Sequence, residues 1–301
     1  QLGFFLFTIY SKLKKMNIVA VIPARSGSKS IKDKNIIPYK GKPLIFHSIR
    51  TALKSKYINR VIVSTDSNKY KKISMKFGAE VPFLRPKKYS SDNSVDYDYI
   101  LHASKFLIKN KYYPDLIILL RPSTPNRITH VVDTAINLFI KNLKKYDSMR
   151  SVSEFSQPAQ KLFMIKDKQL KGFFDKSLRG EYHAYPRQKF PKTYLPNGYI
   201  DILKPKFFLN KNKLYGKMCP FLTKETLDID YKEDLKKSFW SSQIYKSPRI
   251  FGLLYKDLCY PSKICWQYYL SKILKNLGKL IFLKFNLYIG NPNFLNMWFF
   301  T

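Results

Sequence analysis

A loop of closely spaced cations follows the first long apolar run of the chain. Directly after Ile18–Ile22 the sequence continues Pro23-Ala24-Arg25-Ser26-Gly27-Ser28-Lys29-Ser30-Ile31-Lys32-Asp33-Lys34-Asn35. Small residues let such a turn present backbone N–H groups, and the cations add fixed positive charge, which suits a polyphosphate. A Walker A loop needs glycine where Ser28 and Pro23 stand, so this loop is of another kind.

Two carboxylates near residue 230 stand out because the chain is poor in acids. Asp228 and Asp230 are spaced by two, so an extended backbone places both on one side. Mg²⁺ is typically held by one or two carboxylates together with water and substrate phosphates. Capping of the helix expected from about Lys232 is the structural alternative for Asp230. The sequence leaves both interpretations open.

Other catalytic arrangements find little support. No Ser–His–Asp order, nucleophile elbow or glycosidase-type carboxylate pair can be assembled. The four histidines lack HxxxH spacing, so a histidine-rich metal site is not expected. The three cysteines form no CxxC pair, which fits a reducing cytoplasm and structural roles.

The elements that must position these residues alternate along the chain. Apolar runs predict strands at Ile18–Ile22, Arg60–Thr65, Val81–Arg85, Leu116–Leu120 and Ser148–Ser153. Helical periods separate them at Pro43–Lys54, Asn68–Phe77, Tyr97–Lys109 and Ile128–Lys141. This alternation predicts an α/β fold with a mainly parallel sheet and helices on both faces. A further strand is expected behind the turn at Pro196-Asn197-Gly198.

Polar clusters follow several of the predicted strands. They are Ser64-Thr65-Asp66, Arg85-Pro86 with Ser90-Ser91-Asp92-Asn93, and Arg121-Pro122-Ser123-Thr124-Pro125-Asn126-Arg127. Any one of them could be ordinary loop chemistry. Parallel sheets bind ligands at the carboxyl ends of their strands, so four such loops in succession, counting the first, predict a site along that edge.

Charge and composition narrow the class of protein. The 301 residues include 55 Lys and Arg against 20 Asp and Glu, a net charge of +35, and 45% are hydrophobic, which indicates a globular chain. An anionic partner is one explanation of the charge, but compositional bias is favoured. Zinc-finger spacing and RRM-type aromatics are absent, so no specific nucleic acid is expected as a partner.

The two ends differ from the middle. Residues 1–15 are expected to be an upstream extension before Met16, because their apolar stretch is too short to span a bilayer and lacks the cations of a signal peptide. Residues 241–301 form a basic, aromatic-rich tail. Leu270, Ile273, Leu274 and Leu277 predict an amphipathic helix there, for which packing on the domain or a partner subunit is favoured over contact with a membrane.

A set of motifs between about residues 17 and 238 resembles one known family, the acylneuraminate cytidylyltransferases, or CMP-sialic acid synthetases. The motifs are the first loop, Ser64-Thr65-Asp66, Arg85-Pro86 with Ser91-Asp92, Leu120-Arg121-Pro122-Ser123-Thr124-Pro125, Pro196-Asn197-Gly198 and Leu227-Asp228-Ile229-Asp230. Their order and approximate spacing agree with the family throughout.

The resemblance implies a Rossmann-like nucleotidyltransferase fold over residues 16–240, with an inserted smaller dimerisation lobe at about 154–195. It also implies a cytoplasmic homodimer that joins CTP to a nine-carbon 2-keto acid sugar, gives a CMP-sugar and releases pyrophosphate. Transfer to keto-deoxy-octulosonate or a sugar phosphate on the same fold is the alternative, and a basic nucleic-acid- or membrane-binding protein without catalysis is the remote one.

The same resemblance assigns roles to individual residues. Arg25, Lys29 and Lys34 would be catalytic, neutralising charge on the phosphates. The nucleotide would be bound by Ala24, Arg25, Ser28, Lys29, Lys34, Asn35, Arg85, Ser91, Asp92 and Ser94. The sugar would be bound by Arg121, Ser123, Arg187, Asn197 and Asp201. Asp228 and Asp230 would hold Mg²⁺. No residue is assigned as general base.

Three departures from the family pattern fall on the sugar side. Arg121 stands where sialic acid enzymes commonly have glutamine, Leu195 where arginine is frequent and Asp201 where tyrosine is common. A family lysine aligns near Lys161 only with a one-residue ambiguity. The cytidylyl chemistry is therefore better defined than the sugar, and a legionaminic or pseudaminic type is an alternative to N-acetylneuraminate.

Overall fold

The computed structural model describes residues 16–235 except 176, 179 and 227. The chain divides into two compact units, Gln1–Gln243 and Ile244–Thr301, and the described residues belong to the first. The expectations for residues 1–15 and for the basic tail at 241–301 lie outside the described residues.

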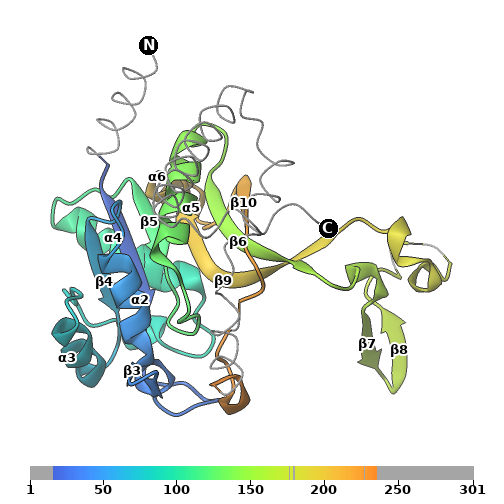
Figure 1. Cartoon of the computed structure of the whole chain (residues 1–301), viewed down its shortest axis with the longest axis horizontal. Helices are drawn as coiled ribbons and strands as arrows, with labels where there is room; N and C mark the ends of the chain where they lie inside the picture. The colour runs from blue at the N-terminus through green and yellow to red at the C-terminus, as the bar shows by residue number, and fades with distance from the viewer. Residues whose placement is uncertain (1–15, 176, 179, 227, 236–301) are drawn as a thin grey trace, which may run out of the picture. The chain divides into compact units, whose positions relative to one another are not determined.

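A six-stranded sheet forms the centre of the first unit (Figure 1). Its strands are β1 (Ile18–Pro23), β4 (Arg60–Ser64), β5 (Leu116–Leu119), β6 (Ser148–Phe155), β9 (Thr193–Leu203) and β10 (Met218–Leu222), in the order β10-β6-β9-β5-β1-β4. Strand β9 runs antiparallel to β5 and β6, and the other pairings are parallel. The predicted α/β class with a mainly parallel sheet is confirmed.

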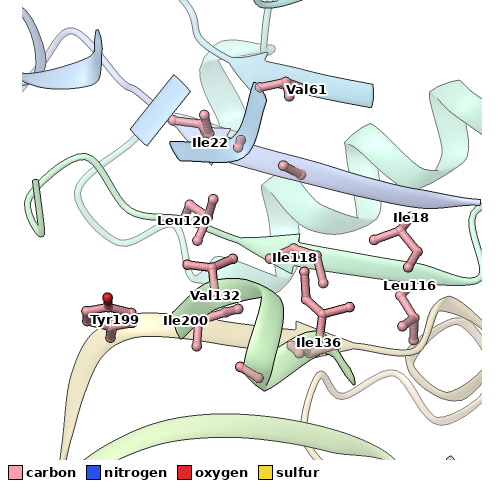
Figure 2. Close-up of a cluster of buried hydrophobic side chains, with 14 of the residues drawn as sticks. Ile18, Ile22, Val61, Leu116, Ile118, Leu120, Val132, Ile136, Tyr199 and Ile200 are labelled. Atoms are coloured by element: carbon pink, nitrogen blue, oxygen red, sulfur yellow. The ribbon is translucent and has the colours of Figure 1, made fainter. Parts of the chain in front are cut away.

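Helices cover both faces of this sheet. One face packs against α2 (Leu44–Leu53), α3 (Asn68–Lys76) and α5 (Thr129–Lys141). The other packs against α4 (Asp96–Lys109) and α6 (Pro205–Lys211). In Figure 2, Ile18 and Ile22 of β1, Ile118 of β5 and Ile200 of β9 meet Val132 of α5 in one buried cluster. Burial on both faces explains why β1 and β5 are continuously apolar.

The prediction of a strand at Val81–Arg85 is wrong. Only Glu80 pairs with the sheet, as a single parallel bridge to Ile62. Pro82 lacks a backbone N–H, so it cannot continue a ladder of hydrogen bonds along β4. The chain instead leaves the edge of the sheet and returns once, where Arg85 N–H donates to the carbonyl of Thr65 at 2.7 Å.

Two short hairpins complete the described part. Strands β2 (Pro38–Tyr39) and β3 (Lys42–Pro43) are joined by Lys40 and Gly41, both at positive φ, as tight hairpin turns require. Between β6 and β9 the chain forms a separate lobe with β7 (Phe163–Lys166), β8 (Gln169–Gly172) and short 3₁₀ turns (Figure 1). None of the helices described is long and apolar enough to cross a membrane.

Candidate functional site

The first cationic loop leaves β1 and is held by residues that follow β4. Asp66 accepts hydrogen bonds from the backbone N–H and the hydroxyl of Ser26, at 2.9 and 3.0 Å. Ala24 is buried and donates its N–H to the carbonyl of Ser64 at 2.9 Å. Asn35 is also buried, and its amide bonds the carbonyl of Arg25 at 3.0 Å. The loop is therefore fixed at the carboxyl ends of β1 and β4.

Two cations of this loop share one carboxylate. Arg25 Nη1 lies 2.6 Å from Asp92 Oδ1, and Lys29 Nζ lies 2.6 Å from Asp92 Oδ2. Hydrogen bonds from Lys29 and Arg25 lower the pKa of Asp92. Ser28 lies between Arg25 and Lys29 in the sequence, and its N–H donates to the carbonyl of Ser26 at 3.1 Å. Asp92 occupies the position that an anionic ligand of Arg25 and Lys29 would take.

The third cation, Lys34, pairs with the predicted metal segment. Its Nζ lies 2.8 Å from Asp230 Oδ1, and its side chain is largely buried. Among the described residues, the side chain of Asp230 accepts no backbone N–H of the following turn. Asp234 instead accepts the N–H groups of Asp230 and Tyr231 at 3.1 and 2.8 Å. The carboxylate of Asp230 thus remains at the site.

Asp228 and Asp230 suit a divalent cation. Asp228 Oδ1 is buried and has no hydrogen-bond partner among the described residues, although a buried carboxylate oxygen normally has one. Hard cations such as Mg²⁺ prefer carboxylate oxygens and complete their shell with water and phosphate. A carboxylate with an unpartnered oxygen, in the segment that contacts the cationic loop through Asp230 and Lys34, fits that requirement. No group of three or more His, Cys, Asp or Glu within the described residues could form an all-protein cage.

Arg85 and the serine loop lie next to the cationic loop. Arg85 is buried; its Nε donates to Ser64 Oγ at 3.0 Å and its guanidinium stacks on Tyr99 at 4.8 Å. Burial lowers the pKa of Arg85. Ser91 and Ser94 bond to each other through their hydroxyls at 3.0 Å. Ser91 and Ser94 lie on either side of Asp92 in the sequence, and Asp92 contacts Arg25 and Lys29, so this serine loop adjoins the cationic loop.

The structure pairs two residues predicted to bind the sugar. Arg121 Nη1 lies 2.8 Å from Asp201 Oδ2, and its Nη2 lies 2.5 Å from Asp96 Oδ2. Asp201 also accepts a hydrogen bond from Tyr215 Oη at 3.0 Å, and Arg150 Nε is 3.6 Å from its other oxygen. Burial disfavours the charge of Arg121, but Asp201 and Asp96 nevertheless hold its pKa above the usual value.

The Pro-Asn-Gly turn of β9 is held by Arg127, which the sequence analysis did not assign to the site. This buried guanidinium donates to the carbonyls of Thr124, Gly198 and Tyr199 and to Ser48 Oγ. Burial lowers the pKa of Arg127 to about 10. Its role is therefore to join the loop after β5 to the turn of β9.

Two more residues predicted to bind the sugar extend the hydrogen-bonded network around Arg127, which we call the frame. The buried Ser123 accepts the N–H of Ile229 at 2.8 Å through its carbonyl. Asn197, also buried, donates to Thr223 Oγ1 at 2.6 Å and accepts the N–H of Tyr199 at 3.2 Å. The frame brings Asp228 and Asp230 to the sheet edge that carries the cationic loop.

Arg187 is the predicted site residue that the structure leaves apart. It begins a 3₁₀ turn, Arg187–Lys189, in the lobe between β6 and β9, and it is exposed. Within the described residues it has no hydrogen bond or ion pair to the other predicted site residues. Lys161, the ambiguous family lysine, lies in another 3₁₀ turn of the same lobe.

Four residues that build the site were not assigned to it from the sequence. Asp66 and Arg127 stand in motifs, so their position after a strand could have marked them. Asp96 and Tyr215 could not have been found, because they reach Arg121 and Asp201 only through the tertiary fold.

The chain is similar to known proteins in sequence and in fold. A family model described as "Cytidylyltransferase" matches residues 19–111. A solved structure of CMP:2-keto-3-deoxy-manno-octonic acid synthetase complexed with CTP covers 75% of this chain and 99% of its own, with a TM-score of 0.55 and 19% identity. That likeness concerns the fold alone. The fold is that of the nucleotidyltransferases.

Relatives found by sequence narrow the class of nucleotidyltransferase to one family. N-acylneuraminate cytidylyltransferase of Escherichia coli is 33% identical over 74% of this chain and 51% of its own length. Pseudaminic acid cytidylyltransferase of Campylobacter jejuni is 29% identical over 73% of this chain and 94% of its own length. Post-translational flagellin modification protein B of Campylobacter coli is 31% identical over 73% of this chain and 92% of its own length. The chain belongs to the acylneuraminate cytidylyltransferase family, and it spans about half the length of the Escherichia coli relative.

Proposed function

We propose that this chain transfers the cytidylyl group of CTP to the anomeric hydroxyl of an acidic nine-carbon 2-keto sugar. The observation that carries the proposal is the position of Lys34, a cation of the loop whose ammonium lies 2.8 Å from Asp230 Oδ1 in the acidic segment. Positive and negative groups from the two ends of the domain thus meet at one edge of the sheet. A metal–triphosphate complex needs both kinds of group.

The residues of this chain act mainly by positioning and charge neutralisation. The sugar oxygen attacks the α-phosphorus, the bond from that phosphorus to the β-phosphate oxygen breaks, and pyrophosphate leaves with the electron pair. The hydroxyl proton passes to solvent. Arg25, Lys29 and Lys34 would stabilise the charge that develops on the phosphate oxygens.

Asp228 and Asp230 would hold Mg²⁺, and Arg25, Lys29 and Lys34 would still neutralise the phosphates. Bound there, the ion would neutralise phosphate charge and lower the pKa of a coordinated hydroxyl. Asp230 would then exchange its contact with Lys34 for the ion, which frees Lys34 for a phosphate oxygen. Because CTP is a cytoplasmic nucleotide, the reaction is placed in the cytoplasm.

The sugar class rests on the relatives and on the buried charges. The relatives named above act on N-acylneuraminate and pseudaminate. Arg121 is neutralised by Asp201 and Asp96, so it is not a free cation for a sugar carboxylate. Arg187 is exposed and its planar fork suits a carboxylate. It would reach the sugar from the lobe of a second copy in a homodimer.

Exposed apolar side chains on the lobe support this dimer. Ile165 and Leu170 face each other across the β7–β8 hairpin and are 79% and 69% exposed. Phe163, Met164, Phe173 and Tyr185 of the same lobe are exposed as well. Apolar patches of this kind mark protein–protein contacts.

The activity is tested by supplying CTP, Mg²⁺ and a panel of N-acetylneuraminate, legionaminate, pseudaminate and keto-deoxy-octulosonate, and measuring pyrophosphate and CMP-sugar. Turnover with at least one nine-carbon sugar is expected. Lys34→Met should lower kcat by about 10²- to 10³-fold, while Lys32→Met, an exposed lysine of the same loop, should not. Folded protein that releases no pyrophosphate with any nine-carbon sugar would refute the proposal.

A further inference from the structure

A buried hydroxyl and a carboxylate lie beside the same glycine, and each has a buried oxygen without a hydrogen-bond partner among the described residues. Thr124 is fully buried, and its hydroxyl oxygen has no hydrogen-bond partner among the described residues; the same holds for Asp228 Oδ1. Buried polar atoms are nearly always bonded, so each exception requires a physical explanation. Two exceptions at one place point to one cause.

Gly198 shows that these side chains converge. A Cβ added to this residue would lie 3.1 Å from Thr124 Oγ1 and 3.7 Å from Asp228 Oδ2. The backbone of Gly198 also has a φ of +67°, which L side chains rarely adopt. Glycine therefore leaves open the side of the turn on which the hydroxyl and the carboxylate meet.

The surrounding bonds hold this geometry in place. Arg127 joins the carbonyls of Thr124 and Gly198, and the N–H of Ile229 bonds the carbonyl of Ser123 at 2.8 Å. Thr124, Gly198 and Asp228 come from three segments. The Arg127 side chain joins the first two, and the backbone bond from Ile229 to Ser123 joins the residues next to Asp228 and Thr124.

The geometry points to Thr124 as a positioning residue for the metal carboxylate, an inference that rests on the proposed function. Its hydroxyl and Asp228 share one water molecule, which holds the carboxylate in the orientation that a divalent cation requires. A hydroxyl can both donate and accept, and a buried water needs two or more polar partners, so the chemistry is complementary. Groups that orient metal ligands in this way typically change metal affinity by about 10- to 100-fold.

Metal binding itself provides the test. Mn²⁺ is titrated into the full chain with CTP present, and free Mn²⁺ is followed by electron paramagnetic resonance. Thr124→Val removes the hydroxyl but keeps the shape, and it should raise the Kd for Mn²⁺ by about 10- to 100-fold. Thr124→Ser retains the hydroxyl and should stay close to the unmodified protein. Thr124→Ala replaces the valine variant if thermal unfolding shows that the latter does not fold.

Asp230→Asn separates this inference from the function on which it rests. If Asp230→Asn weakens Mn²⁺ binding and neither Thr124→Val nor Thr124→Ala does, the role of Thr124 is overturned and the metal site stands. If Asp230→Asn leaves Mn²⁺ binding unchanged, the metal site is elsewhere and both proposals fail. Equal weakening by the serine and valine variants would indicate packing and would also overturn the role of the hydroxyl.

Discussion

Lys29 Nζ lies 2.6 Å from Asp92 Oδ2, so a cation of the first loop already has an anionic partner within the chain. Arg25 contacts the other oxygen of the same carboxylate. A triphosphate bound to these two cations, as the proposed function requires, would compete with Asp92 for the same donors.

Asp92→Asn removes this competition and should lower the Kd for CTP by about two- to fivefold, the range expected for displaced surface ion pairs. Asp167→Asn, which makes the same charge change in the turn between β7 and β8, should leave the Kd as it is. Isothermal titration calorimetry at fixed ionic strength measures both. Weaker binding by Asp92→Asn would show instead that Asp92 contacts the nucleotide directly.

The ion pair between Arg121 and Asp201 should matter for stability. Asp201 is 1% exposed, and its removal leaves the buried guanidinium with Asp96 as the one remaining carboxylate that it contacts among the described residues. Asp201→Asn should lower the free energy of unfolding by about 3–5 kcal/mol, as expected when one partner of a buried pair is lost. Urea unfolding measures this loss, with Arg50→Gln on the exposed side of α2 as a control that should change little.

Combining Asp201→Asn with Arg121→Gln tests the coupling of the pair. The double variant should lose less stability than the sum of the two single variants, because no unpaired charge remains between them. Additive losses would mean that the two residues act independently. Sugar turnover by the double variant would also indicate that Arg121 is dispensable as a sugar ligand.

The stability of the fold should depend on pH between about 7 and 5. Burial lowers the pKa of His47 from its ordinary value of 6.5, although the hydrogen bond to the carbonyl of Tyr39 opposes the shift. The unfolded chain therefore takes up a proton at a higher pH than the folded one, and the free energy of unfolding falls as the pH decreases. Burial also lowers the pKa of His102, which adds to the same trend.

His47→Gln should flatten this pH dependence, and urea unfolding at pH 7.5, 6.5 and 5.5 measures it. His130→Gln replaces an exposed histidine and serves as the control. A slope in His47→Gln equal to that of the unmodified protein would contradict the assignment to His47.

The lobe should control oligomeric state. Ile165→Glu places a charge on the exposed apolar face of the β7–β8 hairpin and should convert a dimer into a monomer, measured by light scattering after size exclusion. Lys166→Glu, on the neighbouring exposed position of β7, should remain dimeric. A monomeric unmodified protein, or an Ile165→Glu dimer, would contradict this role of the lobe.

Much of the sheet could be predicted from sequence because its strands are buried on both faces. Near-continuous apolar runs marked β1, β4 and β5 to within one or two residues. The failure at Val81–Arg85 has a local cause, since Pro82 interrupts a run that is otherwise apolar. The direction of β9 could not be predicted, because an apolar pattern does not distinguish parallel from antiparallel pairing.

The site was less accessible to sequence reasoning than the sheet. The position after a strand identified the cationic loop, and the spacing of Asp228 and Asp230 in an acid-poor chain identified the acidic segment. The structure pairs the two through Lys34 and Asp230. The partners of Arg121 could not be foreseen. Asp96 and Asp201 lie 25 and 80 residues away, and no periodic pattern encodes which buried charges will meet.

The pairing of Lys34 with Asp230 spans 196 residues, and this separation has a consequence for protein synthesis. A ribosome that has translated β10 has already produced every strand of the six-stranded sheet, yet neither Asp228 nor Asp230. The strands of the sheet are therefore synthesised before the two carboxylates that we propose as metal ligands. The proposed active site would be complete only after the acidic segment has been made.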